Sequence, residues 1–183
     1  MQRFITLAFS ALLLLSLNAA TPETHYTVIV SLDGFRWDYP DMYKTPNLDR
    51  MAADGVKAVM LPSYPASTFP NHYTLATGLV PDHHGIINNT FWDVKNRRQY
   101  SMGDSATRNN PEYYFGEPIW ITAQKQGVKT GNMYWVGSDI AIKKSHPTYY
   151  RPWNAKPFLT FEQRIDTCLL YTSDAADDRI SVD

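Results

Sequence analysis

Three polar residues have side chains suited to chemistry on a phosphate group: Asp33, Thr68 and Asn89. The Asp33 carboxylate follows a β-branched, apolar run and precedes Gly34, which lets the backbone turn away and is expected to leave the carboxylate facing the crevice. A carboxylate in that position can bind a hard or borderline cation such as Zn²⁺. Its more ordinary role is to stabilise a turn, and an Asp-Gly pair alone does not decide between the two.

Thr68 lies just before an expected helix over residues 70–77, where free N–H groups and the positive end of the helix dipole favour an anion. A threonine hydroxyl is a weak nucleophile until a metal or a base removes its proton. With a metal bound, the hydroxyl could attack phosphorus while the helix terminus and the Phe69 N–H hold the phosphate oxygens. A plain helix cap is the alternative role.

The Asn89 side chain could donate its amide N–H to a non-bridging phosphate oxygen as charge builds up in the transition state. A turn residue is the alternative. Asn88-Asn89-Thr90 is also an N-glycosylation sequon, which has meaning only in a eukaryotic secretory pathway.

Histidines and aromatic residues near these positions have simpler expected roles. For His72, His83 and His84 we expect structural hydrogen bonds rather than metal ligation, because adjacent histidines seldom chelate one ion. An aromatic wall for a planar base could be formed by Phe69, Tyr149, Tyr150 and Trp153, with core packing as the alternative for each.

The elements that must position these residues alternate between strands and helices. Apolar runs predict strands at 27–32, 56–61 and 128–136, and proline starts with glycine stops predict helices at 45–55, 70–77 and 118–127. This alternation predicts an α/β fold, a layered and mainly parallel sheet with flanking helices. Ligands of such folds bind beyond the carboxyl ends of the strands, where Asp33 and Thr68 are expected. The polar stretch 88–110 predicts an exposed excursion with a hairpin near Asn96-Arg97.

Composition and charge exclude some classes of partner. The 183 residues carry a net charge of −1 with scattered basic residues, so no nucleic-acid-binding surface is evident. Residues 1–20 have a basic start, an apolar stretch and a small-residue exit, which predicts a signal peptide and export to the periplasm or the extracellular space. The apolar stretch is too short to span a bilayer, so no stable membrane anchor is evident; an uncleaved anchor is the alternative.

The end of the sequence has a different character. From about Cys168 it resembles the translation of a sequencing adapter, and it lacks periodicity. We therefore predict three segments: a signal peptide at 1–20, the N-terminal part of a catalytic domain at 21–166, and a non-native tail at 167–183. Cys168 is the single cysteine, so no internal disulfide can form.

Taken together, the motifs are more specific than any one of them. They are Ser31-Leu32-Asp33-Gly34-Phe35-Arg36, Thr45-Pro46-Asn47-Leu48, Thr68-Phe69-Pro70-Asn71-His72-Tyr73, Thr77-Gly78-Leu79 and His84-Gly85-Ile86-Ile87-Asn88-Asn89. Over residues 26–166 the chain resembles the nucleotide pyrophosphatase/phosphodiesterase family of the alkaline phosphatase superfamily. Such a resemblance implies an incomplete alkaline phosphatase-like core in this chain.

The resemblance also implies a two-zinc phosphodiesterase that acts on a nucleotide or another phosphodiester small molecule. Asp33 would be a zinc ligand, and Thr68 would be both zinc ligand and nucleophile, passing through a phospho-threonine intermediate. Asn89 would bind a phosphate oxygen. Phe69 and Tyr150 would flank the nucleobase.

The chain departs from the family pattern in two places. Ser67 stands where many members carry lysine, which puts the substrate preference in doubt. The remaining zinc ligands, from an Asp-x-x-x-His segment, an Asp-His-Gly segment and a final histidine, are not found after residue 139. We therefore expect a fragment with little or no activity. The alternatives are a non-catalytic secreted remnant that binds phosphate or nucleotide, a threonine phosphomonoesterase of the same superfamily, and a lipid-directed choline phosphodiesterase.

Overall fold

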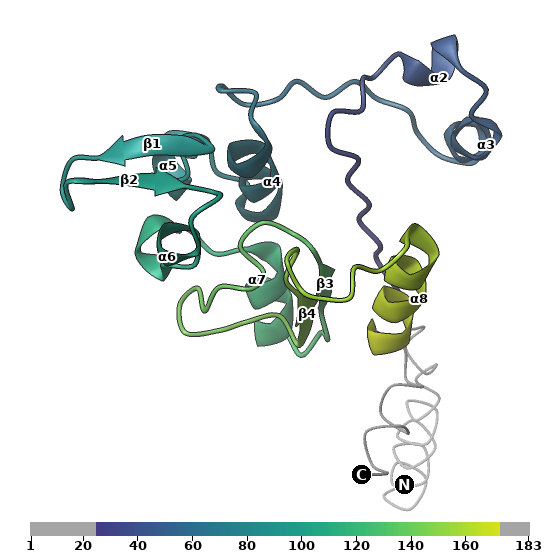
Figure 1. Ribbon diagram of the computed structural model, residues 1–183. Helices are drawn as coiled ribbons and strands as arrows, with labels where there is room; N and C mark the ends of the chain where they lie inside the picture. The colour runs from purple at the N-terminus through teal and green to yellow at the C-terminus, as the bar shows by residue number, and fades with distance from the viewer. Residues whose placement is uncertain (1–24, 173–183) are drawn as a thin grey trace, which may run out of the picture. The chain divides into compact units, whose positions relative to one another are not determined.

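The computed structural model describes residues 25–172, and Figure 1 shows their helices and strands. The predicted signal peptide at 1–20 and residues 173–183 of the predicted tail lie outside the described residues. The described residues fall into two units, which divide between Arg36 and Trp37.

The described part of the first unit is an extended chain that ends in a turn. The Phe35 N–H donates to the Leu32 carbonyl over 3.2 Å, and Gly34 occupies the left-handed region at φ +70°. The predicted strand at 27–32 is wrong here: no strand is formed, and Val30 is 70% exposed. A strand persists only when neighbouring strands take up its N–H and C=O groups, and neither of the two described sheets includes this segment.

The second unit begins with two helices, α2 (Tyr39–Met42) and α3 (Pro46–Asp54). Helix α3 confirms the predicted proline start and glycine stop, since the Gly55 N–H closes it onto the Met51 carbonyl at 3.0 Å. None of its residues is buried. The predicted strand at 56–61 is also wrong, because this segment is irregular and exposed and pairs in neither described sheet.

The rest of the unit mixes helices with two small sheets. Its elements are α4 (Thr68–Thr77), α5 (Pro81–His84), β1 (Thr90–Asp93), β2 (Arg98–Ser101), α6 (Ser105–Arg108), the 3₁₀ helix η1 (Pro111–Tyr113), α7 (Ile119–Lys125), β3 (Gly131–Met133), β4 (Tyr149–Arg151) and α8 (Phe161–Thr172). Strands β1 and β2 pair antiparallel, and β3 and β4 pair parallel. The α/β class is confirmed, as are helices α4 and α7, and the predicted strand at 128–136 shortens to β3.

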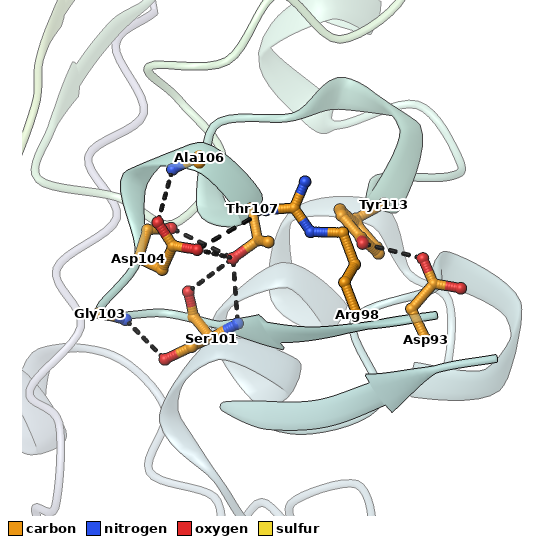
Figure 2. A network of polar contacts seen from close by, with 8 residues as sticks. All are labelled: Asp93, Arg98, Ser101, Gly103, Asp104, Ala106, Thr107 and Tyr113. Carbon is orange, nitrogen blue, oxygen red and sulfur yellow. Dashed lines mark hydrogen bonds and ion pairs between the residues drawn. The ribbon is translucent and has the colours of Figure 1, made fainter. Parts of the chain in front are cut away.

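The hairpin of β1 and β2 confirms the predicted turn near Asn96-Arg97, where Arg97 adopts φ +50°. A polar network ties it to α6, as Figure 2 shows: the Asp104 carboxylate caps α6 by accepting the Ala106 N–H at 2.9 Å, and the Thr107 hydroxyl donates to the Ser101 carbonyl at 3.2 Å. At the other end of the hairpin, the Tyr113 hydroxyl donates to Asp93 at 2.8 Å. The excursion predicted for 88–110 is therefore held by hydrogen bonds to α6 and to Tyr113.

The core is built mainly from aromatic and β-branched side chains. Its buried members are Tyr73, Ala76, Ile86, Tyr100, Tyr113, Tyr114, Trp120, Ile121, Ile140 and Ile142. Tyr73 packs edge-to-face on Tyr114, with ring centroids 5.2 Å apart, and donates its hydroxyl hydrogen to the Phe115 carbonyl at 3.1 Å. Phe91 of β1 stacks on Tyr100 of β2 at 4.6 Å. These contacts fix α4 and the hairpin to the same core.

Helix α8 runs across the boundary predicted between residues 166 and 167. The Cys168 thiol of this helix lies 3.7 Å from the Gly131 carbonyl on β3, and burial raises the pKa of the thiol. The boundary itself stays a prediction. Within residues 25–172, none of the helices combines the length and apolar character needed to cross a bilayer.

Candidate active site

Thr68 is the first residue of α4. Ser67 precedes it as the N-cap with extended backbone, at φ −112° and ψ 155°. Pro70 fits the first turn because an N–H there would have no partner within the helix. The helix is anchored by its buried face, since Tyr73 is fully buried and Ala76 nearly so. The half-buried Thr68 is therefore held at a helix N-terminus whose orientation is set by the core.

Asn89 lies beside this helix N-terminus. Its Oδ1 accepts a hydrogen bond from the Phe69 N–H at 2.9 Å. Because a backbone N–H can only donate, this contact fixes which end of the amide is oxygen, and the Asn89 Nδ2 group remains as a donor. Because the Phe69 N–H donates to Asn89 in this structure, a phosphate oxygen would have to share or displace that bond, and the expected contact between this N–H and phosphate stays a prediction.

The backbone of Asn89 is held by the hairpin. Its carbonyl accepts the Met102 N–H at 2.9 Å, just beyond β2, and its own N–H donates to the Asn88 Oδ1 at 2.8 Å. Strand β1 begins at the next residue, Thr90. The position of Asn89 relative to α4 thus depends on the hairpin and its packing on the core. Asn88, the acceptor of the glycosylation sequon, is exposed.

His72 lies one turn after Thr68 and contacts its backbone. Its Nδ1 is 2.8 Å from the Thr68 carbonyl, so Nδ1 must carry the hydrogen and donate. The Trp135 indole N–H donates to the His72 carbonyl at 3.0 Å, and the two rings meet edge-to-face at 5.6 Å. This chain of contacts stiffens the first turn of α4.

His84 is fully buried between α4 and the loop that leads to Asn89. Its Nδ1 accepts the Ile86 N–H at 3.2 Å, so Nε2 carries the hydrogen and donates to the Pro70 carbonyl at 3.2 Å. Burial lowers the pKa of the His84 imidazole, although the bond to Pro70 opposes this shift. The structural role expected for His84 is confirmed.

The other predicted site residues lie in different environments. Asp33 is in the turn of the first unit and is exposed. Phe69 is half-buried and packs against the core cluster. Tyr150 on β4 is 41% exposed, and its ring stacks on His146 with centroids 4.7 Å apart and planes 7° from parallel. The structure brings together three of the five predicted site residues: a hydrogen bond joins Phe69 to Asn89, and Thr68 precedes Phe69 in the chain.

The donor set fits part of a zinc site. The Asp33 carboxylate and the Thr68 hydroxyl are both oxygen donors of the kind that zinc accepts. Zinc usually takes four ligands, and among residues 25–172 the structure gathers no group of three or more His, Cys, Asp or Glu side chains. Asp33 lies in the first unit and Thr68 in the second, and the metal-ligand role of each residue stays a prediction.

Sequence reasoning missed two residues that shape the site, Asn71 and Trp135. Asn71 lies inside α4, where asparagine is a poor helix former, and this was the signal that could have found it. Trp135 donates to α4 from 63 residues further along the chain, and no local pattern predicts such a contact.

A threonine at a helix N-terminus, with an amide side chain fixed beside it in an α/β domain, defines a candidate phosphoryl-transfer site. A sequence model of the type I phosphodiesterase / nucleotide pyrophosphatase family matches residues 27–182. The chain belongs to this family.

Curated relatives agree with this assignment. Bovine ectonucleotide pyrophosphatase/phosphodiesterase family member 3 is 42% identical over 145 residues, which is 78% of this chain and 16% of the relative. Human family member 1 is 41% identical over 160 residues, 86% of this chain and 17% of the relative. Venom phosphodiesterase 2 of Crotalus adamanteus is 39% identical over 145 residues and is covered to 18%. The chain thus spans about a sixth of the length of the curated relatives it matches.

Solved structures show the same family. Murine ectonucleotide pyrophosphatase/phosphodiesterase 5 superposes with a TM-score of 0.69 and 35% identity, over 78% of this chain and 38% of that structure. An inactive threonine-to-alanine variant of the same murine protein, in complex with AMP, gives a TM-score of 0.70 and 34% identity, over 79% of this chain and 38% of that one.

Proposed function

We propose that this chain is the N-terminal part of an exported, zinc-dependent phosphodiesterase and nucleotide pyrophosphatase that uses Thr68 as its nucleophile. The observation that carries the proposal is the hydrogen bond from the Phe69 N–H to Asn89, which supports a role for the Asn89 amide beside Thr68 in a chain of this family. The AMP complex of the murine relative supports a nucleotide as the substrate class. That the inactive form of this relative is a threonine-to-alanine variant supports a threonine nucleophile.

In the proposed reaction the Thr68 oxygen attacks phosphorus and the oxygen of the leaving group departs. The Thr68 hydroxyl gives up its proton and the leaving group takes one, so that a phospho-threonine intermediate forms that still carries the remaining ester group. Water then attacks its phosphorus, the bond to the Thr68 oxygen breaks, a phosphomonoester such as a nucleoside monophosphate leaves, and the hydroxyl is restored with a proton from the water. Two Zn²⁺ ions, when bound, would activate the nucleophile and stabilise the attacking and leaving oxygens. Asp33 and Thr68 would each provide a ligand, and the other ligands would come from outside the described residues.

The remaining residues would bind and orient the substrate. The Asn89 Nδ2 group, left as a donor by the Oδ1 contact to Phe69, would donate to a non-bridging phosphate oxygen. Phe69 and Tyr150 would flank the nucleobase. His146 already covers one face of the Tyr150 ring, so a base would stack on the opposite face.

The test begins with the source gene, read in frame through and beyond the codons for residues 161–183. The product is expressed and assayed on the p-nitrophenyl ester of thymidine monophosphate, with and without a chelator. We expect Thr68→Ala to abolish hydrolysis and Asn89→Ala to lower kcat by roughly 100-fold. Thr45→Ala, at the N-cap of the exposed helix α3, is the matched control and should retain full activity.

A trapped intermediate separates this mechanism from its rivals. Acid quenching followed by peptide mapping should find thymidine monophosphate bound through its phosphorus to Thr68 during turnover of the thymidine ester. Hydrolysis of monoesters in preference to diesters would favour the threonine phosphomonoesterase. Release of phosphocholine from choline lipids would favour the lipid-directed enzyme. Nucleotide binding with no turnover, and with weak uptake of at most one Zn²⁺, would favour the binding-only remnant.

A further inference from the structure

We propose that Asn71 is a positioning residue that fixes the backbone around Thr68, so that the nucleophile is held in place before substrate binds. The inference rests on the proposed function of Thr68. It starts from the hydrogen bonds of one half-buried side chain on the first turn of α4.

The Asn71 side chain bonds to three residues of the loop that leads to Thr68. Its Oδ1 accepts the Ser63 N–H at 2.8 Å. Its Nδ2 donates to the Pro65 carbonyl at 2.9 Å and to the Ser67 carbonyl at 3.0 Å, with the Ser63 carbonyl at 3.3 Å as a weaker, shared acceptor. One amide therefore uses both its donors and its acceptor on a single loop.

The loop has few other means of holding its shape. Pro62 and Pro65 lack an N–H, and within the loop backbone the Ser67 N–H donates to the Pro65 carbonyl at 2.8 Å. Asparagine is unfavourable inside a helix, because its side chain competes for backbone groups. At this position the Asn71 side chain bonds to backbone groups of the preceding loop, and these bonds take the place of backbone hydrogen bonds that the loop does not form within itself.

Three side chains bond to the backbone on either side of Thr68, the proposed nucleophile. The carbonyl before Thr68, that of Ser67, accepts from both the side chain and the backbone N–H of Asn71. The N–H after Thr68, that of Phe69, is bound by Asn89, and the carbonyl of Thr68 itself is bound by His72. Both peptide groups that flank Thr68 are thus fixed by side chains. Among Asn71, Asn89 and His72, Asn71 is the residue that also bonds to the loop before α4, at Ser63 and Pro65.

This arrangement predicts an effect on turnover more than on substrate binding. An in-line attack needs the nucleophile within a narrow range of positions, and a displacement of about 1 Å can cost roughly 100-fold in rate. The Asn71 side chain is proposed to act through the backbone and not on the substrate. Loss of Asn71 should therefore lower kcat and leave KM nearly unchanged.

Two substitutions separate the acceptor from the donors. Asn71→Asp keeps an oxygen for the Ser63 N–H but removes both donors, and Asn71→Ala removes everything. Amide hydrogen exchange of Ser63 is measured in this chain, and kcat and KM are measured on the thymidine ester with the product of the in-frame gene. Asn47→Ala, at an exposed position of α3, is the matched control.

We expect Asn71→Ala to speed exchange at Ser63 by about 10-fold or more, whereas Asn71→Asp keeps this amide protected. Both variants should lower kcat by roughly 10- to 100-fold with KM within about threefold, because both lose the bonds to Pro65 and Ser67. Assays well below each variant's melting temperature separate this effect from unfolding.

Two results would overturn the inference, and they are distinguishable. If the wild-type product hydrolyses nothing, the proposed function fails and the positioning role falls with it. If the wild type is active and Asn71→Ala or Asn71→Asp retains its kcat, or if KM rises while kcat holds, only the positioning role is overturned.

Discussion

Residues 25–61 and residues 68–142 are both rich in apolar side chains, yet only the second segment buries them. Val30 and Leu61 are 70% and 87% exposed, whereas Tyr73 and Ile86 are 0% exposed. Helix α3 has a proline start and a glycine stop and buries nothing, while α4 packs Tyr73 into the core. Correct local signals thus produce a helix in both segments but produce packing in only one.

The difference lies in where each segment finds its partners. In residues 68–142 the partners are near in sequence: α5 follows α4, and β1 pairs with β2 through a short turn. The apolar runs at 27–32 and 56–61 have the composition of strands buried in a parallel sheet, which are stable only between other strands. Four predictions follow from this difference, from the largest expected effect to the smallest; the first two compare the segments directly, and the last two concern buried and surface groups of residues 68–142.

A core substitution should separate the segments most clearly. Tyr73→Ala removes a fully buried ring and its hydrogen bond to Phe115, and we expect a loss of about 3–5 kcal/mol in the free energy of unfolding. Met60→Ala changes a side chain that is 69% exposed and should cost less than about 0.5 kcal/mol. Urea denaturation followed by circular dichroism measures both. Equal losses would contradict the contrast.

Two glycines give a second comparison. Gly85 has φ +87°, and a Cβ there would lie 2.5 Å from the Tyr113 carbonyl oxygen, so Gly85→Ala combines backbone strain with a clash. We expect a loss of roughly 2–4 kcal/mol. Gly34 has φ +70° with open space around it, and Gly34→Ala should cost about 1 kcal/mol through strain alone. Calorimetric melting tests both, and a larger effect at Gly34 would refute the comparison.

The buried His84 predicts a dependence of stability on pH. Its folded-state pKa is lowered from the ordinary 6.5, chiefly by burial, so below 6.5 the unfolded chain takes up a proton more readily than the folded one. The free energy of unfolding should therefore fall as the pH drops below 6.5 and be at its full value above it. Urea midpoints at about pH 7.5 and about pH 5 measure the slope.

The control for this prediction is His84→Gln, which cannot titrate. It should be less stable than the wild type near neutral pH, because a buried hydrogen-bond network is disturbed, by about 1–3 kcal/mol. Its stability should then change less between the two pH values. An unchanged slope would assign the pH dependence to other groups.

The smallest expected effect is at the surface. The Glu117 carboxylate contacts the Lys125 ammonium at 2.5 Å, and this bond, with others to Thr122 and Lys143, lowers the pKa of the carboxyl to about 2. A lowered pKa stabilises the fold above the ordinary 4.5, and the contribution is lost as the pH falls towards 2. Glu117→Gln should lower the melting temperature slightly, and added salt should shrink the difference. Glu112→Gln is the exposed control.

The sequence was informative where structure depends on neighbouring residues. The N-terminus of α4 at Thr68, the closure of α3 at Gly55 and the turn at Arg97 all follow from short patterns. The hydrogen bond between Phe69 and Asn89 joins positions 20 residues apart. The sequence patterns predicted that each residue would contact the phosphate, but they did not predict a bond between the two. The strand predicted at 27–32 does not form. Apolar composition indicates that a segment could pair in a sheet, but it does not indicate whether a partner strand is present.

The contact between Trp135 and α4 makes the first turn of this helix accessible to optical measurement. The indole N–H donates to the His72 carbonyl one turn after Thr68, and the two rings are in edge-to-face contact. A variant in which Trp37, Trp92, Trp120 and Trp153 are replaced by phenylalanine would keep one fluorophore at that point. Its emission would report, in real time and without a substrate, each opening and closing of the turn that carries Thr68.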